Sequence, residues 1–221
     1  MIDTTQTDLV TRELIRRIRS HFPDDGSGHG FDHIIRVHRL ALAIAGEEKA
    51  DLFVVSVAAL LHDVGDYKLT GDGKENHRQA VADMTEGLSL SAFQIEQVTQ
   101  IVERVSFKGN GTCDEQISPE GQCVRDADRL DAMGAIGIAR AFAYGALKGR
   151  PMFDQEQTPG TFNSFEAYKN NKSHTINHFH EKLLLLRDRM NTATGRRLAE
   201  KRHAFLVSYL DEFRAEWEGS R

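Results

Sequence analysis

The sequence lacks most of the features of secreted, membrane-spanning and nucleic-acid-binding proteins. Its 221 residues include only 2 cysteines and 4 prolines, and the net charge of -5 leaves no basic excess to attract nucleic acid or anionic lipid. No apolar run approaches the ~20 residues of a membrane span, and the opening segment lacks the apolar core of a signal peptide. We therefore expect a cytoplasmic protein that binds neither a membrane nor a nucleic-acid polymer. The two cysteines, Cys113 and Cys123, match no zinc spacing and are expected to be reduced thiols.

The sequence also lacks the apolar-polar alternation of β-strands, and its dominant period is helical. With 40% hydrophobic residues the chain is long enough to bury a sizeable core, so we predict an all-α helical bundle in a single domain over residues 1–221. The predicted helical regions are stripes at 10–18 and 34–44, an apolar helix at 53–61, a polar helix at about 75–86, a helix that begins after Ser91, one or two helices at 123–147 broken near Gly134 and Gly137, and a last region at 165–217. Two stretches rich in turn residues, 108–122 and 148–164, are predicted to be loops.

Residue types that bind metals gather where predicted helices begin or end. His33 lies in the first turn of the second helix, and His62 and Asp63 follow the apolar run at 53–61. Three further carboxylates, Asp126, Asp128 and Asp131, lie on a later helix. Two imidazoles and two carboxylates from three helices would form a nitrogen and oxygen site for a divalent first-row metal, with positions left for water or substrate.

The alternative reading is that these are capping or hydrogen-bonding residues, because a His-Asp pair often arises by chance. Context favours the metal site. A carboxylate that closes an almost wholly apolar helix is costly to bury unless it is paired or ligated.

The order of these residues resembles the H…HD…D signature of the HD-domain metal-dependent phosphohydrolases, an all-helical superfamily. "DHIIRVHRLA" resembles the helix with the first ligand, "ALLHDVGD" the His-Asp helix, and "DADRLDA" the helix with the final aspartate. "ADRL" is similar to the segment with the last ligand in alarmone hydrolases. The resemblance therefore implies His33, His62, Asp63 and Asp128 as the metal ligands.

The resemblance extends beyond the ligands. Residues 178–206 are similar to the C-terminal helices of small, stand-alone bacterial HD hydrolases. It implies one HD domain, with the core motifs at about 20–150 and C-terminal helices at about 164–217 packed on it.

Asp66 is the candidate general base of such an enzyme. It is four residues from His62 and three from Asp63, so it faces the same way as these ligands if the helix persists for another turn. A carboxylate beside a metal orients or deprotonates the attacking water, and the alarmone hydrolases carry an acidic residue at the same offset. The alternative is a simple loop carboxylate.

We expect one divalent metal ion. The ligand set suits manganese, which is our first choice, and iron, nickel or zinc; magnesium fits two imidazoles less well. HD enzymes with two metals carry two further histidines between the His-Asp pair and the last aspartate. Here only His77 lies in that interval, which argues for one metal.

The predicted reaction is hydrolysis of a phosphate ester or anhydride bond in a small nucleotide or other phosphorylated compound. A nucleoside triphosphate split to the monophosphate and pyrophosphate is one form of it. Cationic side chains would balance the phosphate charge, and the candidates are Arg36, Lys68, Lys74, His77 and Lys182. The alternative function is a non-catalytic nucleotide-binding or sensing HD module. The stripes on the last helix leave open whether the protein is a monomer or a homodimer.

Overall fold

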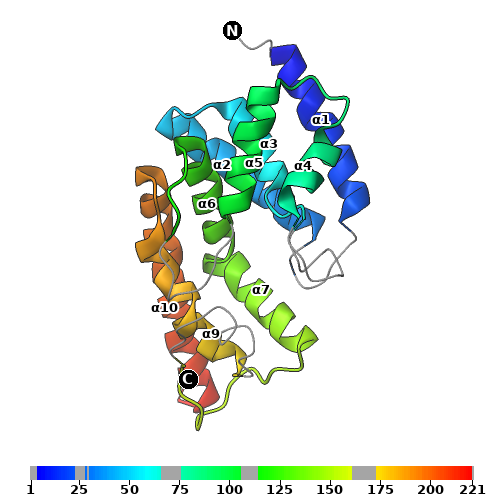
Figure 1. The fold of residues 1–221 in the computed structure, drawn as a ribbon. Coiled ribbons are helices and arrows are strands. Elements are labelled where there is room, and N and C mark those ends of the chain that lie inside the picture. Colours follow the sequence, from blue (N-terminus) through cyan, green and yellow to red (C-terminus); the bar gives the residue numbers. More distant parts are fainter. Residues whose placement is uncertain are drawn as a thin grey trace. The chain divides into compact units, whose positions relative to one another are not determined.

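The structure is a computed structural model that describes residues 4–22, 28, 30–65, 76–105, 114–160 and 173–220. All regular secondary structure within these ranges is helical, which confirms the all-α prediction (Figure 1). The elements are α1 (Thr4–His21), α2 (Phe31–Glu48), α3 (Leu52–Leu61), α4 (His77–Thr85), α5 (Ala92–Val105), α6 (Pro119–Asp131), α7 (Gly134–Leu147), α9 (Thr175–Glu181), the 3₁₀ helix η1 (Leu183–Arg189) and α10 (Ala193–Trp217).

These elements divide between two compact units. Unit 1 contains α1 to α5 and α6 as far as Ala127, whereas unit 2 contains the rest of α6 from Asp128 together with α7, α9, η1 and α10. Helix α6 continues through the boundary without a break. That residues 1–221 form a single domain remains a prediction, which this division into two units does not test.

Helix α3 is the centre of unit 1. It contacts α1, α2 and α5, and all its residues from Phe53 to Leu61 are buried. The Asp51 carboxylate begins the helix, because it accepts hydrogen bonds from the backbone nitrogens of Phe53 at 2.9 Å and Val54 at 3.2 Å. A short helix that is apolar on every side can only be stable when other helices surround it, which explains its position.

Helix α5 begins as predicted after Ser91. The Ser91 hydroxyl accepts from the Gln94 backbone nitrogen at 3.2 Å, and the Gln94 side chain accepts from the Ser91 backbone nitrogen at 2.9 Å. This reciprocal pair is a capping box.

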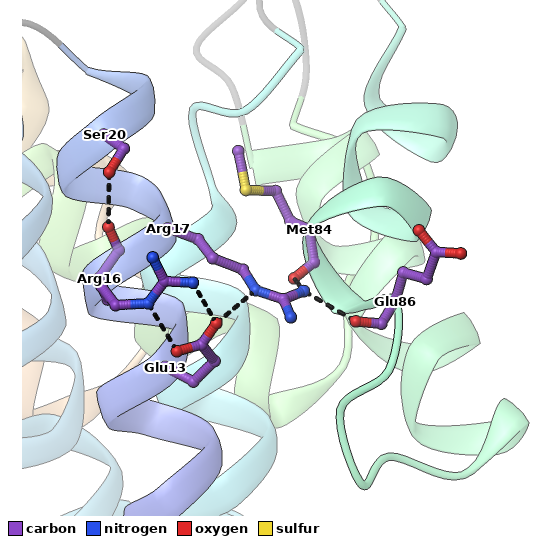
Figure 2. Close-up of polar contacts among 6 residues, drawn as sticks. All are labelled: Glu13, Arg16, Arg17, Ser20, Met84 and Glu86. Atoms are coloured by element: carbon purple, nitrogen blue, oxygen red, sulfur yellow. Dashed lines mark hydrogen bonds and ion pairs between the residues drawn. The ribbon is translucent and has the colours of Figure 1, made fainter.

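Helix α1 is tied to the end of α4 by an arginine (Figure 2). Arg17 donates to the backbone carbonyls of Met84 at 3.0 Å and Glu86 at 2.8 Å, so it satisfies carbonyls that the helix end leaves without helical partners. Glu13 holds the guanidinium from within α1, at 2.9 Å. Hydrogen bonds from Arg16 and then from Arg17 lower the pKa of Glu13 to about 2.

Helix α6 begins earlier than the sequence analysis predicted. The interval 108–122 was predicted to be a loop, but α6 starts at Pro119. The Ser118 hydroxyl accepts from the Gly121 backbone nitrogen at 3.2 Å, and proline suits the first helical position because its missing N–H has no partner there. Proline and glycine here mark a helix start, so the loop prediction was wrong at this end.

Helices α6 and α7 are separated near Gly134, as predicted. The two helices are bent by 65° at the short break, and Gly134 starts α7 with a φ of 68°. Among the described helices none is long and apolar enough to cross a membrane alone; α6 and α7 pass that test only as a bent pair, by length and composition.

Unit 2 is built around α10, which contacts α7 and η1. Rings from α7, α9 and α10 pack together, with Phe142 6.2 Å from Tyr209 and Phe179 stacked on Tyr209 at 6.0 Å between centroids. The predicted helical region at 165–217 is interrupted, because the Thr192 hydroxyl accepts from Gly195 at 2.8 Å and starts α10 anew. Residues 165–172 lie outside the described ranges.

Candidate metal centre

His33 enters the centre from the first turn of α2. Its side chain is on the buried face of that helix and is 1% exposed. The backbone nitrogen of His33 donates to the Gly30 carbonyl at 3.0 Å, so the residue lies in the hydrogen-bonded turn that starts α2.

His62 and Asp63 enter from the turn that ends α3. His62 is the C-cap of the helix, and the backbone nitrogen of Val64 donates to Leu61 at 3.0 Å. The chain then turns at Gly65, which has a φ of 74°. Because regular helix stops at this point, two consecutive side chains can point toward one place instead of diverging by about 100°.

These side chains converge within unit 1. Nε2 of His62 lies 3.3 Å from Nε2 of His33. The two oxygens of Asp63 each lie 3.5 Å from one of these nitrogens. Both rings are buried, whereas the Asp63 side chain is 22% exposed. Three side chains whose donor atoms face one another in this way suit a shared cation.

The tautomer of His62 supports this fit. Its Nδ1 lies 2.8 Å from the carbonyl oxygen of Ala59. A carbonyl only accepts, so Nδ1 carries the hydrogen, which leaves Nε2 as the ring nitrogen whose lone pair can bind a metal. A backbone carbonyl that fixes the tautomer of a histidine is the usual outer partner of a metal ligand.

Asp128 lies on α6 directly after Ala127, the last residue of unit 1. The ligand atoms of His33, His62 and Asp128 lie within 4.8 Å of one another, which makes them a group that could hold a metal ion. Asp131, on the same helix, is instead bound by Arg140 at 2.7 Å. Asp128 thus lies near two histidines, whereas Asp131 is paired with an arginine.

Two buried arginines on α6 lie on either side of Asp128. Arg125 donates to two backbone carbonyls, at 2.9 and 2.7 Å. Arg129 donates to Asp114 at 2.6 Å and to a backbone carbonyl of η1. These arginines were not predicted from the sequence as residues of the site. Two charges one helical turn apart on a buried helix are the pattern that could have indicated them.

Six other residues were predicted to serve in catalysis or substrate binding. Three of them, Asp66, Lys68 and Lys74, lie outside the described residues. Arg36 lies on α2 one turn from the first ligand and is partly exposed. His77 is 7% exposed, and Lys182 is the C-cap of α9 in unit 2.

The structure is that of an all-α protein in which His and Asp side chains form a group that could hold a metal ion. The chain belongs to the HD domain family, whose model matches residues 30–133 and so spans all the predicted ligands. This confirms the resemblance noted in the sequence.

The Bacillus subtilis protein YpgQ, which is uncharacterised, is 39% identical over 217 residues, 96% of each chain. A solved Lactobacillus plantarum structure has a TM-score of 0.83 at 36% identity and covers 99% of this chain and 100% of its own. The structure of YpgQ in complex with ADP has a TM-score of 0.77 at 33% identity, over 96% of each chain.

A solved Bacillus thuringiensis protein described as an HD-superfamily hydrolase has a TM-score of 0.75 at 35% identity. It covers 96% of this chain and 98% of its own. Family membership and this neighbour together support an enzyme of the phosphohydrolase type.

Proposed function

We propose that the protein is a metal-dependent phosphohydrolase that cleaves a phosphate ester or anhydride bond of a small nucleotide. The observation that carries the proposal is the convergence of His33 Nε2, His62 Nε2 and the Asp63 carboxylate within 3.5 Å. A structural bundle gains nothing from burying two imidazoles against one carboxylate at a helix end, because each group loses its hydration there.

His33, His62, Asp63 and Asp128 would hold the ion, and manganese suits this donor set best. A divalent cation here supplies Lewis-acid chemistry, because it polarises a phosphoryl group and lowers the pKa of water. The carboxylates Asp63 and Asp128 would offset the charge of a divalent ion, so other cationic side chains have to balance the charge of the phosphate.

The proposed roles of the other residues follow from proton and charge balance. Water attacks phosphorus, the bond from phosphorus to the leaving oxygen breaks, and Asp66 takes the proton of the water. Cations then balance the phosphate charge. The proposed phosphate contacts are Arg36, Lys68, Lys74 and Lys182.

A nucleotide as substrate is supported by the complex of YpgQ with ADP. That relative is similar to this chain over nearly its whole length, so we extend nucleotide binding to this protein as part of the proposal. Pyrophosphate release from a nucleoside triphosphate is the form of the reaction that we would test first.

The test combines metal content with turnover. We would measure bound metal and Mn²⁺-dependent release of phosphate or pyrophosphate from a panel of nucleoside mono-, di- and triphosphates. The variants are Asp63→Asn and, as a matched control, Asp83→Asn, an exposed carboxylate on α4 that accepts from Gln79 at 2.8 Å. We expect Asp63→Asn to lower turnover by more than about 100-fold, since even outer partners of a metal ligand are worth roughly 10- to 100-fold.

Asp83→Asn should leave both readouts at the wild-type level. Bound metal without turnover on any nucleotide would favour the sensing module instead. A wild-type protein that binds no divalent metal would refute the proposal.

A further inference from the structure

The turn that carries Asp63 has little helical support of its own. Helix α3 ends at Leu61, and residues 62–65 form a turn in which Val64 donates back to Leu61 at 3.0 Å. The orientation of the Asp63 carboxylate therefore depends on what holds the carbonyls of the next two residues, Val64 and Gly65.

Both carbonyls are held by the start of α4. The ring of His77 places Nδ1 2.8 Å from the carbonyl oxygen of Val64. The backbone nitrogen of Asn76 donates to the carbonyl of Gly65 at 3.0 Å. Asn76 and His77 thus donate hydrogen bonds to the carbonyls of Gly65 and Val64, the two residues directly after the ligand pair.

The approach of these two segments is close. A Cβ atom on Gly65 would lie 2.7 Å from the carbonyl oxygen of Asn76 and 3.0 Å from Cα of His77, and its φ of 74° also favours glycine. The backbone of Gly65 is therefore in close contact with the backbone of Asn76 and His77, and this contact places the His77 ring beside the turn.

The contact with the carbonyl determines which nitrogen of the His77 ring donates a hydrogen bond. A carbonyl only accepts, so Nδ1 of His77 carries the hydrogen and donates it to Val64. The side chain is 7% exposed, so water competes little for that carbonyl.

We infer that His77 is a positioning residue for the metal centre, which acts through the Val64 carbonyl to hold the turn that presents Asp63. The inference rests on the proposed function of that centre. It assigns His77 a different role from the phosphate contact predicted from the sequence, because the contact that the structure gives is with the backbone beside a ligand.

Two substitutions separate the roles. Asn places its amide nitrogen close to the position of Nδ1, whereas Gln reaches toward the position of Nε2. A positioning role therefore survives in His77→Asn and fails in His77→Gln, and a direct contact of Nε2 with substrate gives the opposite result.

The readout is Mn²⁺ affinity without nucleotide, measured by electron paramagnetic resonance, alongside KM and kcat. We expect His77→Gln to weaken Mn²⁺ binding roughly 10- to 100-fold, as loss of an outer partner does, and His77→Asn to keep most of the affinity. Unchanged Mn²⁺ affinity in His77→Gln, or a raised KM confined to His77→Asn, would overturn the inference.

A second measurement depends neither on turnover nor on how the variants fold. The ¹⁵N chemical shifts of the wild-type ring report which nitrogen carries the proton. We expect the Nδ1–H tautomer, and an Nε2–H tautomer would overturn the inference. If the wild type binds no metal, the proposed function fails, while this NMR result still reports on the contact with Val64.

Discussion

At the scale of single residues, the surroundings of two helical glycines show opposite requirements. A Cβ on Gly137, in the first turn of α7, would lie 2.2 Å from the backbone carbonyl oxygen of Ala132. A Cβ on Gly46, in α2, would meet nothing within 4 Å. Glycine is therefore required where α6 gives way to α7, whereas in α2 it only adds conformational freedom to the unfolded chain.

We predict opposite effects of alanine at these positions. Gly137→Ala should lower the free energy of unfolding by about 1–3 kcal/mol, because the carbonyl of Ala132 has to move. Gly46→Ala should raise it by roughly 0.5–1 kcal/mol, because an exposed helix interior favours alanine. Urea unfolding followed by circular dichroism measures both, and a stabilised Gly137→Ala would contradict the close approach.

At the scale of elements, the side chain of Arg17 joins α1 to the end of α4. The guanidinium of Arg17 reaches the carbonyls at the end of α4, whereas the guanidinium of Arg16 bonds Glu13 within α1 (Figure 2). The side chain of Arg17 is 26% exposed and that of Arg16 is 69% exposed. The pairing of helices here depends on the less exposed of two adjacent arginines.

Substitution of each arginine should separate these contributions. We predict that Arg17→Ala lowers the free energy of unfolding by about 1–2 kcal/mol, because it leaves helix-end carbonyls without their charged donor. Arg16→Ala should leave the free energy of unfolding close to the wild-type value, since exposed ion pairs contribute little. Equal losses in the two variants would mean that the contact with α4 adds nothing beyond the surface charge.

At the scale of the whole molecule, a buried polar chain links three helices of unit 1. His38 of α2 lies with Nε2 2.9 Å from the hydroxyl of Ser56 in α3, which is 3.2 Å from the hydroxyl of Thr11 in α1. Burial, and then the charge of Arg39, lowers the pKa of His38 to about 4. The ring is therefore neutral in the folded protein at neutral pH.

This histidine makes stability depend on pH. The unfolded chain binds the proton with a pKa of about 6.5. Between about 6.5 and the folded value, the unfolded state holds more protons. The contribution of His38 is thus complete above about pH 6.5 and is lost as the pH falls toward about 4, by at most about 1.4 kcal/mol per pH unit.

We predict that His38→Gln, which keeps a group able to bond Ser56 but cannot titrate, flattens the fall in unfolding free energy over this range. The exposed His21 offers a control, and His21→Gln should leave the slope unchanged. Denaturant unfolding at a series of pH values gives the slopes. An identical slope in His38→Gln and wild type would show that His38 does not stay neutral in the fold.

Local patterns in the sequence were sufficient to predict the all-α class and the approximate position of most helices. Helical period, the Ser91 cap and the glycine at the start of α7 act within a few residues, so neighbouring residues alone reveal them. The residue types at the candidate centre were also predictable, because a His-Asp pair at the end of an apolar helix stands out in the sequence.

Contacts between distant residues were decided only by the tertiary structure. The partner of His77, the Val64 carbonyl, lies 13 residues away, and the partner of Arg129 in η1 lies 60 residues away. Asp128 and Asp131 lie on the same helix, but Asp131 is bound by Arg140, whereas Asp128 lies near His33 and His62. The sequence by itself determined which residues are chemically able to hold a metal; folding decided which of them meet, because that depends on atoms that only packing brings together.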